Sequence, residues 1–225
     1  MLRNLSAVTL LLLATGLAAA APAPFTLKVV DGTPPPKELA EPIRKLLSER
    51  SMQLADAKGE LTLELWFRTE LPTKASEAQA QNGLTYREVP ESTVVGAVRV
   101  VRQFIDFRKQ KIKPGVYTLR LGFQPMDGDH MGTAPFSEFC LLCPAAEDKS
   151  PETLETKPLQ ELAGKTTGTH PGVMLLFPAK DAAEPKLVDK GEGNWVLQFK
   201  QDAAVAGKKA PLGIAITVAG VSPAA

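Results

Sequence analysis

The chain has 225 residues, with 26 Lys or Arg against 25 Asp or Glu, so its formal net charge at pH 7 is +1. Hydrophobic residues make up 44% of the sequence and charged residues 23%, which is typical of globular domains and excludes a wholly disordered chain. The balanced charge also argues against nucleic-acid binding, because non-specific binding of that kind requires a strong basic excess.

The first twenty residues have the pattern of a secretory signal peptide. Arg3 supplies a positive charge, residues 5–17 form an apolar segment, and residues 18–20 are small enough for a cleavage site. We therefore expect residues 1–20 to be removed and the mature protein to be secreted or periplasmic. The apolar segment falls short of the roughly 20 residues of a membrane span, and we expect no span later in the chain. No cysteine lies near the cleavage site, so no lipobox is expected.

Residues 21–225 are expected to form a single β-rich domain. A chain of this size buries roughly 70% of its unfolded surface, which is enough for a core without help from a metal or disulfides. The alternative is a boundary between two subdomains near residues 144–171, where the strand pattern is weakest. The short C-terminal part would then have only a small core, so one domain is preferred.

Most apolar segments alternate with a period of two, which predicts strands rather than helices. Leu61, Leu63, Leu65 and Phe67 are expected on one face of a strand. In a later strand Thr118 and Arg120 are expected on the outward face. The pattern predicts nine strands, at residues 25–30, 60–68, 84–89, 94–101, 116–123, 137–142, 173–177, 195–200 and 212–218.

Helical patterns are few and short. Leu39, Ile43, Leu46 and Leu47 form one apolar stripe, which predicts a helix over residues 37–49. Shorter helices are expected at residues 74–81 and 158–163. Parallel sheets need a helix at each crossover, so this pattern predicts an all-β fold, an antiparallel β-sandwich of transthyretin-like or Ig-like type.

Residues 114–132 read PGVYTLRLGFQPMDGDHMG. The first part resembles the PGxYxLxV strand common in transthyretin-like secreted β-sandwich modules. The whole segment is similar to a PGxYTLRLGFQPxDGDHxG pattern in uncharacterised secreted bacterial proteins, and the similarity extends over residues 61–178. This resemblance implies a location outside the cytoplasm and a β-sandwich fold, and it supplies no catalytic residue.

The densest polar segment is the loop at residues 126–132. Its Asp127, Asp129 and His130 lie between two methionines, and such a set can bind a metal. A calcium loop is excluded, because Met131 stands where an oxygen ligand is needed. The alternative is a hairpin turn in which Asp and Gly supply the unusual backbone angles.

Cys140 and Cys143 form a CxxC pair within an apolar segment. Haem attachment requires a His at the next position, where Pro144 stands. In an extended strand these Cα atoms lie about 10 Å apart, whereas a disulfide tolerates about 7 Å. The sequence therefore predicts either buried, inert thiols or a bend that permits a bridge.

The two cysteines also suggest a metal hypothesis. Together with His130 and His170 they can form a Cys₂His₂ zinc site or a copper site. Copper and zinc are the two metals considered, and no other cofactor is expected.

A basic segment lies in the middle of the chain, where Asp106 is the single acidic residue between positions 92 and 126. If its cations share a face, they form a patch for an anionic polysaccharide or an envelope surface. The alternative is an ordinary set of solvated side chains. The cations are Arg99, Arg102, Arg108, Lys109, Lys111 and Lys113, with Arg120 further along.

These patterns favour a non-catalytic secreted or periplasmic binding or structural protein. The first alternative is the metal-binding protein with His130, Cys140, Cys143 and His170. The second is a hydrolytic enzyme with Asp127, Asp129 and Glu138 beside His130.

Overall fold

Seven strands pair into one antiparallel sheet, the first layer of a sandwich-like fold. The computed structural model describes residues 24–125, 134–180 and 182–222. The strands lie side by side in the order β1-β2-β3-β5-β8-β9-β10, so the all-β antiparallel prediction is confirmed. Their bounds are β1 Phe25–Asp31, β2 Leu47–Asp56, β3 Leu61–Arg68, β5 Val94–Val100, β8 Gly115–Phe123, β9 Glu138–Pro144 and β10 Gly172–Leu175.

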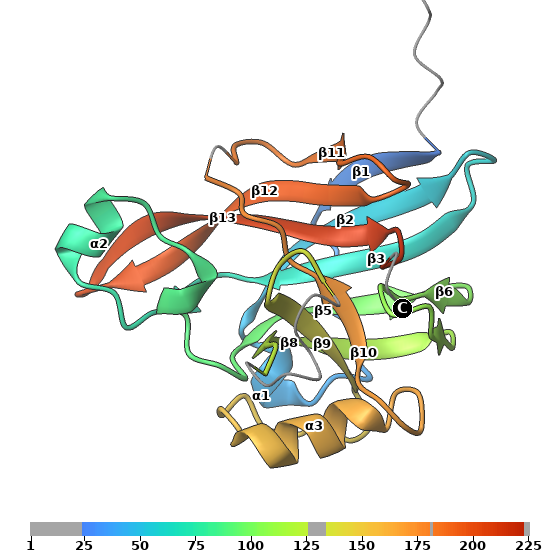
Figure 1. Ribbon diagram of the computed structural model, residues 1–225, viewed down its shortest axis with the longest axis horizontal. Helices are drawn as coiled ribbons and strands as arrows, with labels where there is room; N and C mark the ends of the chain where they lie inside the picture. Colours follow the sequence, from blue (N-terminus) through green and yellow to red (C-terminus); the bar gives the residue numbers. More distant parts are fainter. Residues whose placement is uncertain (1–23, 126–133, 181, 223–225) are drawn as a thin grey trace, which may run out of the picture.

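The second layer consists of β11 Lys186–Asp189, β12 Trp195–Val205 and β13 Lys208–Ala219 (Figure 1). A two-residue strand, β4 Leu71–Pro72, pairs with β12 in parallel. The layers join where the end of β10 meets β13, because the N–H of Phe177 donates to the carbonyl of Ala215 at 2.8 Å. A separate hairpin, β6 Phe104–Ile105 and β7 Lys111–Ile112, projects from one end of the molecule.

The core lies between the two layers and follows the predicted alternation. Leu63, Leu65 and Phe67 of β3 are each at most 4% exposed. They pack in one cluster with residues of β12 and β13, and the rings of Phe67 and Phe199 lie 4.3 Å apart. Burying a side chain of this size stabilises a fold by roughly 1.5–3 kcal/mol. The period-two pattern therefore identified the core face correctly.

The outward face of β8 is covered by a later part of the chain and is not exposed to solvent. Thr118 and Arg120 do point away from the main core, but neither is exposed. Residues 145–155 and the helix α3 Thr156–Gly164 lie over this face of the sheet. Asp148 of the covering segment accepts hydrogen bonds from both side chains. This partner is distant in sequence, so local alternation did not reveal it.

Two predicted elements take other conformations. The expected strand at residues 84–89 is a 3₁₀ helix, η1 Tyr86–Glu88. Thr85 and Glu88 cap its first turn, with the Thr85 N–H donating to the Glu88 carboxylate at 2.7 Å. Such local bonds compete directly with strand pairing.

The expected helix at residues 37–49 shrinks to α1 Glu41–Arg44. Leu47 already belongs to β2, where it pairs with Arg68 of β3. The apolar stripe still works as a unit, because Leu39, Ile43 and Leu47 pack around Trp66 on the outer face of the first sheet. Strand pairing therefore shortened the helix without exposing its apolar residues.

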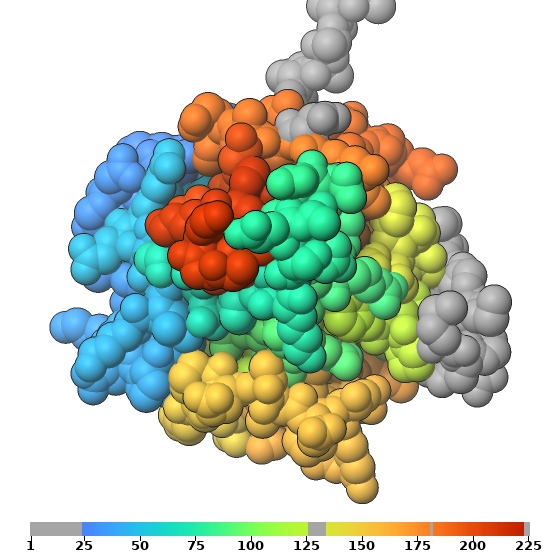
Figure 2. Space-filling model, turned by 90° about the vertical axis from the view of Figure 1, so that its left-hand side faces the viewer, coloured from blue at the N-terminus to red at the C-terminus, as the bar shows by residue number. Residues whose placement is uncertain are grey.

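The helix predicted near residues 74–81 is confirmed as α2 Glu77–Gln81, capped by Ser76. Figure 2 shows this green region beside the red turn between β12 and β13. Lys208, the first residue of β13 after that turn, pairs with Glu77 at 3.0 Å. Throughout the described ranges, no helix combines the length and apolarity needed to cross a bilayer.

Candidate functional site

Asp106, the acidic residue of the β6–β7 hairpin, holds the turn in place. It is fully buried, and its Oδ1 accepts from the backbone N–H groups of Arg108 at 2.9 Å and Gln110 at 2.8 Å. Oδ2 accepts from the Gln110 side-chain amide at 2.9 Å and from the N–H of Val173 at 3.0 Å. Burial raises the pKa of Asp106, and these hydrogen bonds oppose the rise. The carboxylate therefore faces inward and fixes the hairpin to β10.

The outward side of this hairpin carries positive charge. Arg108, Lys109, Lys111 and Lys113 are all exposed and lie within six consecutive residues. Arg108, Lys111 and Lys113 form no ion pair with any carboxylate of the described residues. We call residues 104–113 the basic hairpin. The cations of this hairpin are exposed, whereas Asp106, the acidic residue nearest to them in sequence, faces the interior.

Two other members of the predicted patch are neutralised locally. Arg99 lies on the outer face of the first sheet, where its Nη1 is 3.2 Å from Glu64 Oε2 and its guanidinium lies over Trp66. Arg102 pairs with Glu60, which raises the pKa of Arg102 through a hydrogen bond and its charge. Of the six predicted cations, Arg108, Lys111 and Lys113 are therefore the ones that remain without an ion pair to a described carboxylate.

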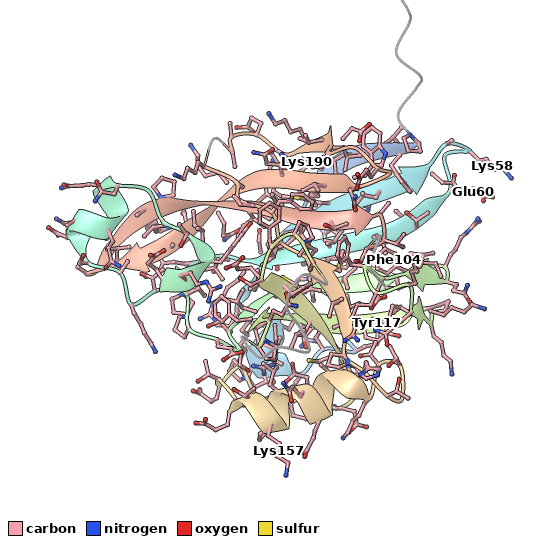
Figure 3. The ribbon with its side chains drawn as sticks, in the orientation of Figure 1. Lys58, Glu60, Phe104, Tyr117, Lys157 and Lys190 are labelled. Carbon is pink, nitrogen blue, oxygen red and sulfur yellow. The ribbon has the colours of Figure 1, made fainter. Side chains whose placement is uncertain are left out.

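An apolar pocket of about 240 Å³ opens beside the basic hairpin. Ile105 at its mouth is 38% exposed, and Val101, which precedes the lining residues in sequence, is 37% exposed. Within the described ranges these are the two exposed large hydrophobic side chains. Figure 3 shows Phe104 at the same end of the molecule as Lys58 and Glu60. We call this space the hairpin pocket; its apolar lining includes Phe25, Leu63, Phe104, Ile105, Val218 and Val221.

A larger pocket of about 480 Å³ lies between the two sheets. It adjoins an irregularity in β2, where residues 48–50 stand opposite a single residue of β3. Such bulges bend a strand away from its neighbour. Met52, Phe67 and Phe199 contribute apolar surface, while the charged residues around it are of both signs. Arg50 is paired with Asp31, so this rim does not favour one charge of ligand.

The strand β9 places the two cysteines on opposite faces. Cys140 lies in the main core, whereas Cys143 packs against Leu159 and Ala163 of α3. Both are free thiols and fully buried. Burial raises the pKa of both, to about 12 for Cys143. Of the two outcomes that the sequence left open, buried thiols or a bend that permits a bridge, the structure has the buried thiols.

The predicted metal ligands are not brought together by the part that is described. His170 is exposed in the loop before β10, and the two thiols face opposite sides of one strand. His130 lies outside the described residues. Among the residues that are described, no group of three or more His, Cys, Asp or Glu is arranged to hold an ion. The copper or zinc site stays a prediction.

The hydrolytic alternative depends on a loop that is not described. Asp127, Asp129 and His130 lie outside the described residues. Glu138, the remaining member, pairs with Arg87 at 2.7 Å. The buried groups with raised pKa values, Tyr86 and Cys140 among them, line neither pocket. The described pockets therefore offer no pair of a nucleophile and a base with shifted pKa values.

Comparisons of the chain with protein families, with curated proteins and with solved structures give no match. The resemblance of residues 114–132 to secreted bacterial proteins stays a prediction.

Proposed function

We propose that this protein is a non-catalytic, exported binding module that docks on an anionic surface of the cell envelope through the basic hairpin. The observation that carries the proposal is the exposure of Arg108, Lys111 and Lys113 without a described carboxylate partner. The inward orientation of Asp106 supports it further, because the turn is fixed without an exposed acid. The signal-like pattern at residues 1–20 supports export.

The strength expected of such docking follows from simple electrostatics. Each Lys or Arg close to an anionic membrane contributes about 1 kcal/mol. The attraction decays over about 10 Å at 0.1 M salt, so cations on a projecting hairpin count more than those elsewhere. A turn that is already rigid also loses little conformational freedom on binding. Arg108, Lys111 and Lys113 are therefore sufficient for weak, reversible docking that depends steeply on salt.

The test is sedimentation of the purified protein with phosphatidylglycerol vesicles, with phosphatidylcholine vesicles and with alginate, over a range of NaCl concentrations. We expect binding to an anionic probe that falls as salt rises, and little binding to phosphatidylcholine. The double variant Lys111→Glu/Lys113→Glu should lower the association constant at least tenfold.

The matched control is Lys157→Glu/Lys190→Glu, which changes the net charge by the same amount. Figure 3 shows both residues away from the hairpin, Lys157 on α3 and Lys190 beside β11 and β12. The control should bind as the unaltered protein does. Equal losses in the two double variants, or no binding to either anionic probe, would contradict the proposal.

A further inference from the structure

The hairpin pocket lies directly beside the docking cations, and the two features together indicate what the docked partner is. Building on the docking function proposed above, we infer that the hairpin pocket takes the hydrocarbon chain of an anionic amphiphile. The partner is then a lipid with a negatively charged headgroup rather than a polysaccharide. The inference rests on three observations: the apolar lining of the pocket, the exposed apolar side chain at its mouth, and the positive charge beside that mouth.

The lining suits a hydrocarbon chain. Phe25, Leu63 and Val218 come from the ends of β1, β3 and β13, and Phe104 comes from the hairpin. Leu63 and Val218 belong to the main core, so the floor of the pocket continues the protein interior. Each methylene moved from water into such surroundings strengthens binding about fourfold. A polysaccharide has no comparable chain to place there.

The exposure at the mouth points to the same class of partner. Ile105 is 38% exposed, while the other large apolar side chains of the described ranges, apart from Val101 outside the pocket, are more protected. Apolar side chains next to Lys and Arg are characteristic of proteins that bind at a membrane interface. An alginate-like polymer would make use of the cations and leave Ile105 in water.

Positive charge lies beside the mouth of the pocket, where an inserted amphiphile would place its headgroup. Lys111 of β7 lies opposite Ile105 of β6 and therefore stands beside the mouth of the pocket, whereas Arg102, which lines the pocket, is already paired with Glu60. A chain inserted between Phe104 and Val218 would leave its headgroup outside, near Lys111. Asp106, the acid nearest in sequence, faces β10 and holds the wall of the pocket in place. The site therefore exists before any ligand arrives.

The wall formed by the hairpin is fixed from its inner side. Phe104 pairs with Ile112, which is fully buried in the main core. Phe107 packs with Val173 and Leu175 of β10, and its carbonyl accepts from the N–H of Ser222 at 2.7 Å. A preformed apolar site of this kind loses little conformational entropy when a ligand binds.

The test uses two soluble probes with the same headgroup, decyl phosphate below its micelle concentration and butyl phosphate. Binding is followed by ¹⁵N–¹H correlation spectra at the amides of Thr62, Gln103 and Gly220, which line the hairpin pocket. We expect decyl phosphate to bind at least tenfold more tightly than butyl phosphate, with shifts confined to these amides.

Two variants at the mouth separate hydrocarbon binding from charge, since both keep every cation. Ile105→Asn should weaken binding of decyl phosphate about tenfold, and Ile105→Val should change it less than twofold. Ile105→Asn should still show salt-dependent binding to phosphatidylglycerol vesicles, at reduced affinity.

The other possible outcomes distinguish failure of the hydrocarbon-binding inference from failure of the docking function. Equal affinity for the two probes, with vesicle binding intact, overturns the inference and leaves the docking function standing. Binding to alginate without binding to phosphatidylglycerol vesicles does the same and makes the partner a polysaccharide. Shifts at Met52 and Phe199 instead would move the site to the larger pocket and overturn the assignment. No binding to any anionic probe overturns both proposals.

Discussion

Arg120 and Asp148 form a two-point ion pair in the interior, with Nε–Oδ2 and Nη2–Oδ1 distances of 2.8 Å each. The Arg120 side chain is 0% exposed and that of Asp148 is 3% exposed. Arg120 Nη1 also donates to the carbonyls of Ser92 at 2.6 Å and Glu152 at 2.9 Å. This pair therefore fastens the segment after β9 onto β8 and covers the outer face of the first sheet.

Removing one partner of this pair should be costly. Asp148→Ala leaves the Arg120 guanidinium buried without a counter-charge, a change that destabilises proteins by about 3–5 kcal/mol. Urea unfolding should show that loss in the free energy of unfolding. The control is Glu60→Ala, which breaks the exposed pair with Arg102 and should cost at most about 1 kcal/mol. Similar costs in the two variants would show that the buried pair does not fasten the segment.

Gly213 of β13 is required by a close backbone approach. A Cβ at this position would lie 1.6 Å from the carbonyl oxygen of Ala179, which is backbone and cannot turn aside. Gly213→Ala should push the segment around Ala179 away from β13 and lower the free energy of unfolding by about 1–3 kcal/mol or more.

Gly115→Ala is the matched control, because a Cβ there meets Tyr117 at an ordinary 3.5 Å. Surface-type changes of this kind stay within about 0.5 kcal/mol. Thermal or urea unfolding of both variants compares them directly. If Gly213→Ala were as stable as the control, the approach of Ala179 to β13 would not be a constraint on the fold.

Because the two thiols are buried, the free energy of unfolding should vary with pH in the alkaline range. Burial raises the pKa of Cys143 to about 12, whereas an unfolded thiol ionises near about 8.5. Below the unfolded pKa both states keep the proton, and stability does not change through this group. Between these pKa values only the unfolded state loses it, so stability falls as pH rises.

Urea midpoints measured from pH 7 to pH 10.5 should therefore decline above about pH 8.5. Cys143→Ala should flatten the decline, while Cys140 leaves part of it in place. The same burial predicts that a thiol reagent such as dithiobis(nitrobenzoate) labels neither cysteine at pH 8 until urea unfolds the chain. Rapid labelling of the folded protein would contradict the burial of the two thiols.

The sequence predicted those parts of the fold that depend on local pattern. Leu63, Leu65 and Phe67 alternate without interruption, and β3 was placed to within a residue at each end. The strand β2 was missed, because residues 48–50 form an irregularity that breaks the alternation. The burial of Arg120 was missed for another reason, since its partner Asp148 follows at a distance of 28 residues.

The candidate site likewise has one part that the sequence predicted and another part that it did not. The cations from Arg108 to Lys113 stand out in the sequence because Asp106 is the lone acid near them. The sequence overestimated the number of cations in the patch. Arg99 pairs with Glu64 of a neighbouring strand, a partner 35 residues away in sequence. The hairpin pocket gave no sequence pattern at all, because its walls come from four separate strands. A single clue was available in Phe104 and Ile105, two apolar residues in a segment between Arg102 and Arg108.

The position of each cation, rather than the total charge, should decide docking. Lys111→Gln and Arg99→Gln both lower the net charge by one. Lys111 has no described carboxylate partner, so its loss should reduce binding to phosphatidylglycerol vesicles about fivefold, the equivalent of about 1 kcal/mol. Arg99 is already paired with Glu64 on the outer face of the first sheet, so its loss should change binding less than twofold.

Vesicle sedimentation at 50 and 200 mM NaCl, with melting temperatures checked first, measures the difference between these variants. The salt dependence should also weaken for Lys111→Gln alone, since one fewer cation then reaches the anionic surface. If both variants lose the same affinity, the attraction comes from overall charge and the basic hairpin has no special part in it. If Arg99→Gln loses more, the docking face is the outer side of β3 and β5, and the hairpin pocket lies away from the membrane.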